Sequence, residues 1–256
     1  MKTALLVVSF GTTHLDTFEK TIQATENALV AEFPEYTVYR AFTSGMVRKR
    51  LMSKYEISVD SIEESLARIS RDGFDAVIVL PTLLIPGEEY DKLLAVTSSA
   101  AGSLNVSVCK PLLYCEQDLD NIIQILHKAY PTKDDTVLLL MGHGTEHSAN
   151  DLYIRLAKKM RSYPGCTMRL CTVEGTPSFE DAINELTQMP QRQIKVAPLM
   201  FVAGDHAKND MASEDPDSLR SLLAENGFSV ECCVQGLGEF ETVQQMYASK
   251  VRGCIA

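Results

Sequence analysis

Apolar runs of strand length alternate along the chain with longer stretches in which apolar residues recur at helical spacing. In the first half, strands are expected at 4–10, 36–42, 75–85 and 105–113, with helices at 17–33 and 58–73. In the second half, the same order continues with runs at 135–142, 166–173, 192–202 and 228–235. Strands that are apolar on both faces and joined by helices predict the α/β fold class, with parallel sheets covered on both sides.

The two halves of the chain also resemble each other. Residues 5–14 align without gaps on 138–147, with two leucines, a Gly-Thr pair and a final His in common. Residues 81–93 align on 198–210, with Pro over Pro and Gly over Gly. Between these matches, 43–45 falls over 173–175 at an equivalent strand end. Three matches in the same order indicate an internal duplication. We therefore predict two similar domains, residues 1–132 and 133–256, each a parallel sheet flanked by helices.

The aligned halves differ at three positions that carry chemistry. The second half has His143, Glu174 and His206 where the first half has Phe10, Ser44 and Glu89. All three positions lie just beyond predicted strands, where open α/β sheets bind their ligands. Any one of these side chains alone is more commonly an ordinary loop residue. Together, two imidazoles and a carboxylate suit a divalent first-row metal. His147 follows His143 by four residues, but the glycine between them predicts a turn rather than a helix with two ligands on one face.

Composition narrows the function classes. The chain is 45% hydrophobic and 23% charged, as is usual for a soluble globular protein. No apolar run reaches the roughly 18 residues that span a bilayer, and the first residues lack a cleavage site, so we expect a cytoplasmic protein without membrane contact. A net charge of -10 disfavours nucleic acid as a partner. The sequence leaves association into a homo-oligomer open.

Cysteine usage and phosphate-loop motifs exclude two further classes. The seven cysteines are odd in number and form no CxxC pair, so reduced thiols are expected rather than a zinc ribbon or a disulfide framework. No GxxxxGK[ST] loop is present, and no nucleotide is expected as cofactor.

Longer motifs resemble one family over nearly the whole chain. They are "ALLVVSFGTTHLDT" (4–17), "RAFTSGMVRKRL" (40–51), "IPGEEYDKL" (85–93), "MGHGTEHSA" (141–149), "VEGTPSFED" (173–181), "PLMFVAGDHAKNDMAS" (198–213) and "GLGE" (236–239). The chain resembles the anaerobic sirohydrochlorin cobaltochelatases, which belong to the ATP-independent tetrapyrrole chelatases. The resemblance implies two similar α/β domains with the active site in a cleft between them.

The resemblance also implies roles for individual residues. His143 matches the His of the family's "MGHG" and His206 that of its "AGDH", so both are expected metal ligands. Glu174 matches the acidic residue of "VE" and would complete the metal site or accept protons. Gly204 permits a tight turn before His206, and Asp205 is available to orient its ring.

The implied reaction is insertion of Co²⁺ into sirohydrochlorin, or precorrin-2, in anaerobic cobalamin biosynthesis. Ni²⁺ or Fe²⁺ insertion into the same or a related tetrapyrrole stays open, because strand-end histidines do not separate first-row ions. A non-catalytic carrier of metal or tetrapyrrole is the alternative from another class. One departure bears on the metal: some relatives have a His before "GEEY", where this chain has Leu83.

The substrate is a macrocycle with many carboxylates, and the first half offers groups to bind it. Ser9, Gly11 and Thr12 lie at the first strand-to-helix turn, where backbone N–H groups bind anions. Arg48, within "VRKR", could pair with carboxylates, and Leu83 is apolar enough to line the pocket. Phe10, Ser44 and Glu89 complete the predicted substrate-binding set.

Overall fold

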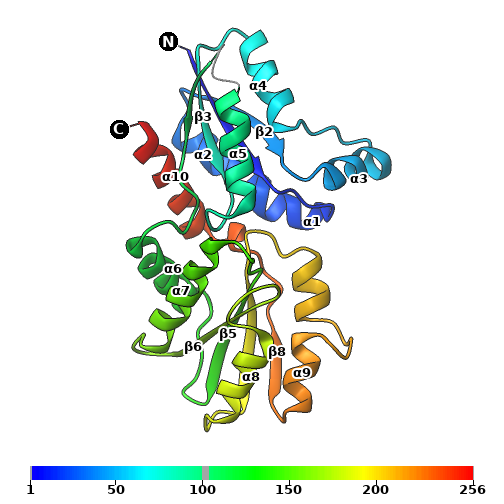
Figure 1. Cartoon of the computed structure of the whole chain (residues 1–256), viewed down its shortest axis with the longest axis vertical. Coiled ribbons are helices and arrows are strands. Elements are labelled where there is room, and N and C mark those ends of the chain that lie inside the picture. The colour runs from blue at the N-terminus through cyan, green and yellow to red at the C-terminus, as the bar shows by residue number, and fades with distance from the viewer. Residues whose placement is uncertain (1, 100–103, 256) are drawn as a thin grey trace. The chain divides into compact units, whose positions relative to one another are not determined.

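The apolar strands form two four-stranded parallel sheets in the computed structural model, which describes residues 2–99 and 104–255 (Figure 1). The first sheet has the order β2-β1-β3-β4, with β1 at Thr3–Ser9, β2 at Thr37–Phe42, β3 at Ala76–Pro81 and β4 at Asn105–Val108. The second has the order β6-β5-β7-β8, with β5 at Thr136–Gly142, β6 at Thr167–Thr172, β7 at Gln193–Leu199 and β8 at Ser229–Cys232. The predicted strands and the α/β class are confirmed.

Several strands end earlier than their apolar runs suggested. β3 ends at Pro81 and β7 at Leu199, although the predicted strands continued to 85 and 202. The apolar residues beyond these ends lie in loops that fold back onto the cores. Leu83 packs against the core of the first sheet, and Phe201 is buried. Their apolarity therefore reflects loop packing rather than strand pairing.

Helices cover both faces of each sheet. The helices of the first half of the chain are α1 (Leu15–Phe18), α2 (Ala24–Glu32), α3 (Gly45–Tyr55), α4 (Ile62–Arg71) and α5 (Glu88–Ser99), with a π-helical turn η1 (Glu19–Gln23) joining α1 to α2. The helices of the second half are α6 (Glu116–Ala129), α7 (Asp151–Arg161), α8 (Phe179–Thr187), α9 (Leu219–Glu225) and α10 (Glu241–Ile255). Short turns are η2 (Ser148–Asn150), η3 (Ala207–Met211) and η4 (Leu237–Glu239). Both predicted helices are present; α4 begins at Ile62 because Ser61 and Glu64 form a capping box.

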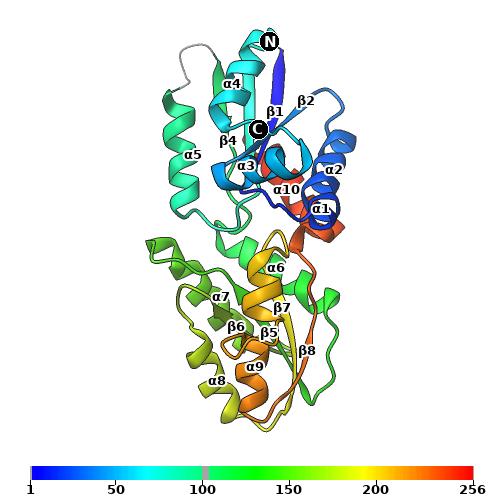
Figure 2. The same cartoon turned by 90° about the vertical axis from the view of Figure 1, so that its right-hand side faces the viewer.

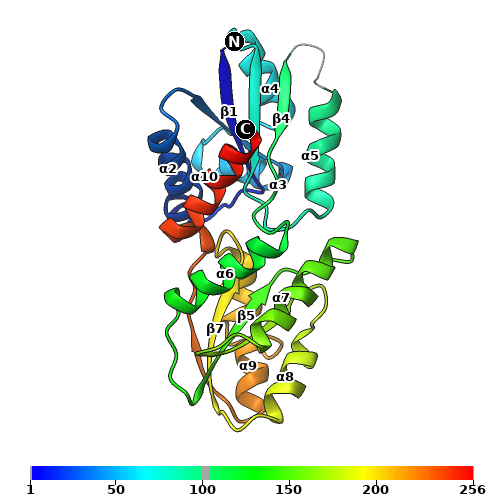
Figure 3. The same cartoon turned by 90° about the vertical axis from the view of Figure 1, so that its left-hand side faces the viewer.

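Alternate residues of the central strands face different helices. In the first sheet, Ala4, Leu6 and Val8 pack against α4 and α5, while α2 and α10 lie on the other side. In the second sheet, Val137, Leu139 and Met141 pack against α8 and α9. Figures 2 and 3 show these helical layers from opposite sides. No described helix is both long enough and apolar enough to cross a membrane.

The pairing registers of the two sheets are equivalent under the sequence alignment of the halves. Val8 pairs with Pro81, and the aligned Met141 pairs with Pro198. Ser9 pairs with Phe42, and the aligned Gly142 pairs with Thr172. Backbone hydrogen bonds beyond the strands repeat as well: Ser44 N donates to Phe10 O at 3.3 Å, and Glu174 N donates to His143 O at 2.8 Å. Identical strand order and register support the duplication.

The chain divides into two units at points that differ from the predicted boundary. The first unit comprises Met1–Tyr114 and Gly238–Ala256, and the second comprises Cys115–Leu237. Helix α6 belongs to the second unit because its buried face packs with α7 and Lys159 pairs with Asp120 at 2.5 Å. Helix α10 returns to the first unit, where it packs on α2 and β3. No sequence pattern predicted that the last helix would return to the first unit.

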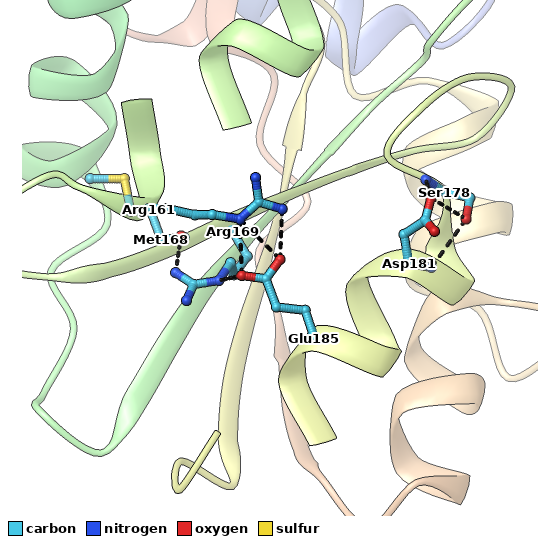
Figure 4. A network of polar contacts seen from close by, with 6 residues as sticks. All are labelled: Arg161, Met168, Arg169, Ser178, Asp181 and Glu185. Atoms are coloured by element: carbon cyan, nitrogen blue, oxygen red, sulfur yellow. Dashed lines mark hydrogen bonds and ion pairs between the residues drawn. The ribbon is translucent and has the colours of Figure 1, made fainter. Parts of the chain in front are cut away.

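A charged cluster ties β6 to the helices beside it (Figure 4). Arg161, at the end of α7, donates from Nη2 to Oε2 of Glu185 in α8 at 2.7 Å. Arg169 Nε, from β6, lies 2.5 Å from Oε1 of the same carboxylate. The hydrogen bonds from Arg161, reinforced by the charge of Arg169, hold the pKa of Glu185 below its ordinary value. The cluster therefore anchors the strand whose end carries Glu174.

Candidate metal-binding site

Three neighbouring strands of the second unit carry the residues predicted to bind metal. His143 follows β5 directly, Glu174 follows β6, and His206 lies beyond β7. Because β6, β5 and β7 are adjacent in that order, the loops at their carboxyl ends emerge next to one another. The rings of His143 and His206 lie 4.6 Å apart between centroids, at 84° to each other. Glu174 Oε2 is 3.7 Å from His143 Nδ1.

Tyr153 packs against the start of the loop that carries His143. The Tyr153 ring packs so closely under Gly142 that a Cβ there would lie 2.6 Å from it. Its phenolic oxygen accepts hydrogen bonds from the backbone N–H groups of His143 and Gly144, yet burial dominates and raises the pKa of Tyr153 to about 12. Tyr153 therefore stays a neutral phenol, and its packing against Gly142 holds the start of this loop in position.

The loops of His143 and Glu174 are joined by backbone and amide contacts. Glu174 N–H donates to the carbonyl of His143 at 2.8 Å. Asn150 bridges the same loops, because its Oδ1 accepts from Thr145 N at 3.3 Å and its Nδ2 donates to Thr176 O at 2.9 Å. His147 forms part of the predicted turn, where its Nδ1 accepts from Ala149 N at 3.1 Å. Because Nδ1 accepts, the hydrogen of a neutral His147 ring lies on Nε2.

Hydrogen bonds determine which ring nitrogens remain for a metal. His143 Nδ1 lies 3.0 Å from the Gly144 carbonyl oxygen, and His206 Nδ1 lies 2.5 Å from Oδ2 of Asp210. Carbonyl and carboxylate oxygens only accept, so Nδ1 carries the hydrogen in both neutral rings. Each Nε2 then keeps its lone pair for a metal ion. The carboxylate that meets His206 Nδ1 is that of Asp210 rather than that of Asp205, the residue expected to orient the ring.

The site offers two nitrogen donors rather than a closed cage. Among residues 2–99 and 104–255, no group of three or more His, Cys, Asp or Glu is arranged to hold a metal ion. The Glu174 side chain is 60% exposed, and those of His143 and His206 are 45% and 40% exposed. Two imidazoles with open positions suit an ion that is to be passed on, since exchange needs free coordination sites.

One protein family matches the chain over nearly its whole length. The family model for cobalt chelatase (CbiK) matches residues 3–256. The chain belongs to the cobalt chelatase (CbiK) family. It is 34% identical over 253 residues to a sirohydrochlorin cobaltochelatase of Salmonella typhimurium, covering 97% of this chain and 95% of that relative. It is also 29% identical over 245 residues to the sirohydrochlorin cobaltochelatase CbiKC of Nitratidesulfovibrio vulgaris, covering 94% and 86%.

Solved chelatases share the fold of this cobalt chelatase family member. SirB from Bacillus subtilis with Fe³⁺ superimposes with a TM-score of 0.68 at 14% identity, covering 100% of this chain and 96% of that one. CbiX, described as the terminal enzyme of siroheme biosynthesis in denitrifying bacteria, gives a TM-score of 0.63 at 17% identity, covering 99% and 100%. At such identities the likeness concerns the fold. The predicted family and the enzyme class, a metal chelatase, are confirmed by the family and sequence matches.

In this cobalt chelatase the equivalent strand ends of the first unit carry different chemistry. Phe10 is 50% exposed at the end of β1. Ser44 caps α3 by accepting from Val47 N at 3.3 Å, and Glu89 pairs with Lys92 at 2.9 Å. These three positions present no imidazole, so at the equivalent strand ends the pair of histidines occurs only in the second unit.

The other residues predicted to bind substrate lie in the first unit, and most of them already contact neighbouring residues of the fold. Ser9 is buried and its hydroxyl accepts from Thr82 Oγ1 at 2.8 Å, while Thr12 Oγ1 accepts from His14 N at 3.2 Å. Gly11 has φ +97° and packs against the Phe42 ring. The charge of Arg48 is paired with Glu64 at 2.6 Å, and Leu83 is partly buried against the core. Of the predicted substrate contacts, Phe10 presents the largest exposed apolar side chain.

Proposed function

We propose that this protein inserts Co²⁺ into sirohydrochlorin, or precorrin-2, without using a nucleotide. The observation that carries the proposal is the pair of imidazoles, His143 and His206, with ring centroids 4.6 Å apart and both Nδ1 atoms already hydrogen bonded. The names of the two relatives, both sirohydrochlorin cobaltochelatases, supply the substrate. Ni²⁺ and Fe²⁺ are the competing substrate metals, since imidazole binds all three ions.

The proposed chemistry is an exchange of ligands coupled to loss of protons. Co²⁺ leaves water and the Nε2 atoms of His143 and His206 and binds four macrocycle nitrogens. The macrocycle loses two N–H protons, so the net charge of the products balances that of the reactants. Glu174, whose carboxylate lies 3.7 Å from Nδ1 of His143, accepts one proton as general base, and a histidine that has released the ion accepts the other. Co²⁺ is a substrate here, which agrees with the open character of the two-nitrogen site.

Substrate contacts are assigned to the strand ends of the first unit. Phe10 offers half of its side-chain surface for packing against the macrocycle. Gly11, at φ +97°, holds the backbone turn whose N–H groups would bind a substrate carboxylate. Arg48 would have to exchange its partner Glu64 for a substrate carboxylate, so we expect it to contribute less than its charge suggests.

An anaerobic absorbance assay tests the proposal. Sirohydrochlorin is mixed with the protein and Co²⁺, Ni²⁺ or Fe²⁺, and the macrocycle spectrum is followed against a protein-free control. We expect protein-dependent metallation that falls by at least about a hundredfold in H143A and H206A, because each loses one of two nitrogen donors. As a control, H127Q removes an imidazole of α6 that packs on Tyr163, and it should keep wild-type turnover.

The alternative outcomes are distinct. Spectral changes that report macrocycle binding, without accelerated metallation by any of the three metals, would make this protein a carrier. Faster turnover with Ni²⁺ or Fe²⁺ than with Co²⁺ would support a chelatase whose substrate metal is not Co²⁺. Wild-type turnover in H206A would contradict the assignment of the site.

A further inference from the structure

The two imidazoles of the site have hydrogen-bond partners of different charge. His206 Nδ1 lies 2.5 Å from the carboxylate of Asp210, whereas His143 Nδ1 lies 3.0 Å from the neutral carbonyl of Gly144 and 3.7 Å from the carboxylate of Glu174, which is beyond hydrogen-bond distance. We propose that Asp210 is a positioning residue that fixes the tautomer and direction of the His206 ring, making His206 the stronger of the two donors for Co²⁺. This inference rests on the proposed function of the site.

The backbone around Asp210 is fixed by the core of the second unit. Asp210 lies in the π-helical turn Ala207–Met211 that begins directly after His206. Ala207 and Met211, which immediately follow His206 and Asp210, are fully buried in the core cluster that also contains Met141 and Leu219. Two buried anchors four residues apart hold the intervening turn in place. His206 and Asp210 therefore face the same side of the turn, one above the other.

A charged acceptor changes what His206 can do at its other nitrogen. Charge-assisted hydrogen bonds are shorter and stronger than neutral ones, in agreement with 2.5 Å for Asp210 and 3.0 Å for Gly144. A carboxylate on Nδ1 also makes Nε2 a better electron donor to a metal ion. We therefore expect His206 to hold Co²⁺ more firmly and His143 to release it more readily.

Asp210 contributes little to the stability of the fold. The side chains of His206 and Asp210 are 40% and 42% exposed, so water screens their interaction. Glu214, four residues further along, is 88% exposed and pairs only distantly with Arg220, at 3.7 Å. Its replacement removes the same charge from the same segment without touching the His206 ring, which makes E214Q a matched control.

The experiment uses D210N in the full-length protein. Asparagine keeps the size of the side chain, but its amide both donates and accepts, so it can bind either tautomer of His206. Three properties are measured: the affinity for Co²⁺ alone by visible absorption under anaerobic conditions, the ¹⁵N spectrum of labelled histidines in metal-free protein, and the thermal melting curve. H206A identifies the His206 signals in the ¹⁵N spectrum.

We expect D210N to bind Co²⁺ about ten- to a hundredfold more weakly. The His206 signals should lose the pattern of a ring protonated only at Nδ1, while the melting curve stays that of the wild type. D210E should restore part of the affinity, and E214Q should match the wild type in all three measurements.

Two results would overturn the inference. One is a D210N protein with wild-type affinity for Co²⁺ and an unchanged His206 tautomer. The other is a loss of affinity that accompanies a lower melting temperature while the tautomer stays the same, which would reduce Asp210 to a structural role. None of the three measurements needs the tetrapyrrole, so an inactive wild-type protein would count against the proposed function and not against Asp210.

Discussion

His143 lies between Gly142 and Gly144, and both glycines are required by close packing. Gly144 has φ +78°, and a Cβ on it would lie 2.6 Å from the backbone nitrogen of Gly175 and 2.8 Å from Cβ of Thr172. The loops of His143 and Glu174 can approach only because this atom is missing. At the scale of the residue, the site thus requires glycine at position 144 as well as the two imidazoles.

We predict that G144A separates these two loops and destabilises the second unit. A left-handed backbone costs a non-glycine residue about 1–2 kcal/mol, and the clash with backbone atoms raises the total to about 3 kcal/mol or more. Gly227 has a similar φ of +82°, but its Cβ would meet nothing within 4 Å. G227A should therefore lose only about 1 kcal/mol and keep full activity. Urea unfolding and the metallation assay compare the two variants; equal losses would contradict the packing argument.

At the scale of the element, Glu185 joins α8 to both α7 and β6. Its carboxylate is 28% exposed and is shared by Arg161 and Arg169. Its lowered pKa means that folding favours the ionised form. This stabilisation is present above the pKa of the unfolded chain and is lost as the pH falls through the lower pKa of the folded state.

We predict that E185Q lowers the free energy of unfolding by about 1 kcal/mol at neutral pH, a modest value because Arg161 is nearly half exposed. The difference from the wild type should shrink as the pH falls through the folded-state pKa of Glu185, where the wild-type carboxylate is protonated too. Urea titrations across the acid range measure this trend. E214Q, at an 88% exposed side chain, should change stability little at any pH. A pH-independent cost of E185Q would mean that packing, not charge, is lost.

At the scale of the whole molecule, the chain leaves the first unit before α6 and re-enters it with α10. Helix α10 buries Val243, Tyr247 and Val251 completely in the first unit. Helix α6 buries Leu119, Ile122 and Leu126 in the second. The second unit is thus an uninterrupted segment, while the first is built from both ends of the chain.

We predict that residues 115–237 fold alone and bind Co²⁺, because this segment holds its own sheet, α6 and both histidines. Residues 133–256 lack α6 and carry α10 without the partners for its apolar face, so this fragment should be poorly folded or aggregate. Circular dichroism, melting cooperativity and Co²⁺ titration compare the fragments. Cooperative folding of 133–256, with 115–237 unfolded, would contradict the assignment of α6 and α10.

The strand-end histidines could be predicted from the sequence because the two similar halves of the chain can be aligned with each other. The alignment of 5–14 on 138–147 placed His143 at a strand end, and the aligned registers of β1 and β5 agree with it. Asp210 was missed because nothing in "DHAKND" tells whether the carboxylate one residue before His206 or the one four residues after it meets the ring. The helical turn Ala207–Met211 brings Asp210, four residues further along, to Nδ1 of His206.

The sequence by itself determined the strand and helix order, the duplication, the family and the histidines at the strand ends, because hydrophobic periodicity and motif identity are local properties of the chain. Tertiary structure alone decided that α10 returns to the first unit and that the Ser9 hydroxyl accepts a hydrogen bond from Thr82. Those outcomes depend on contacts between residues that local patterns leave unpaired, such as the apolar face of α10 against α2 and β3.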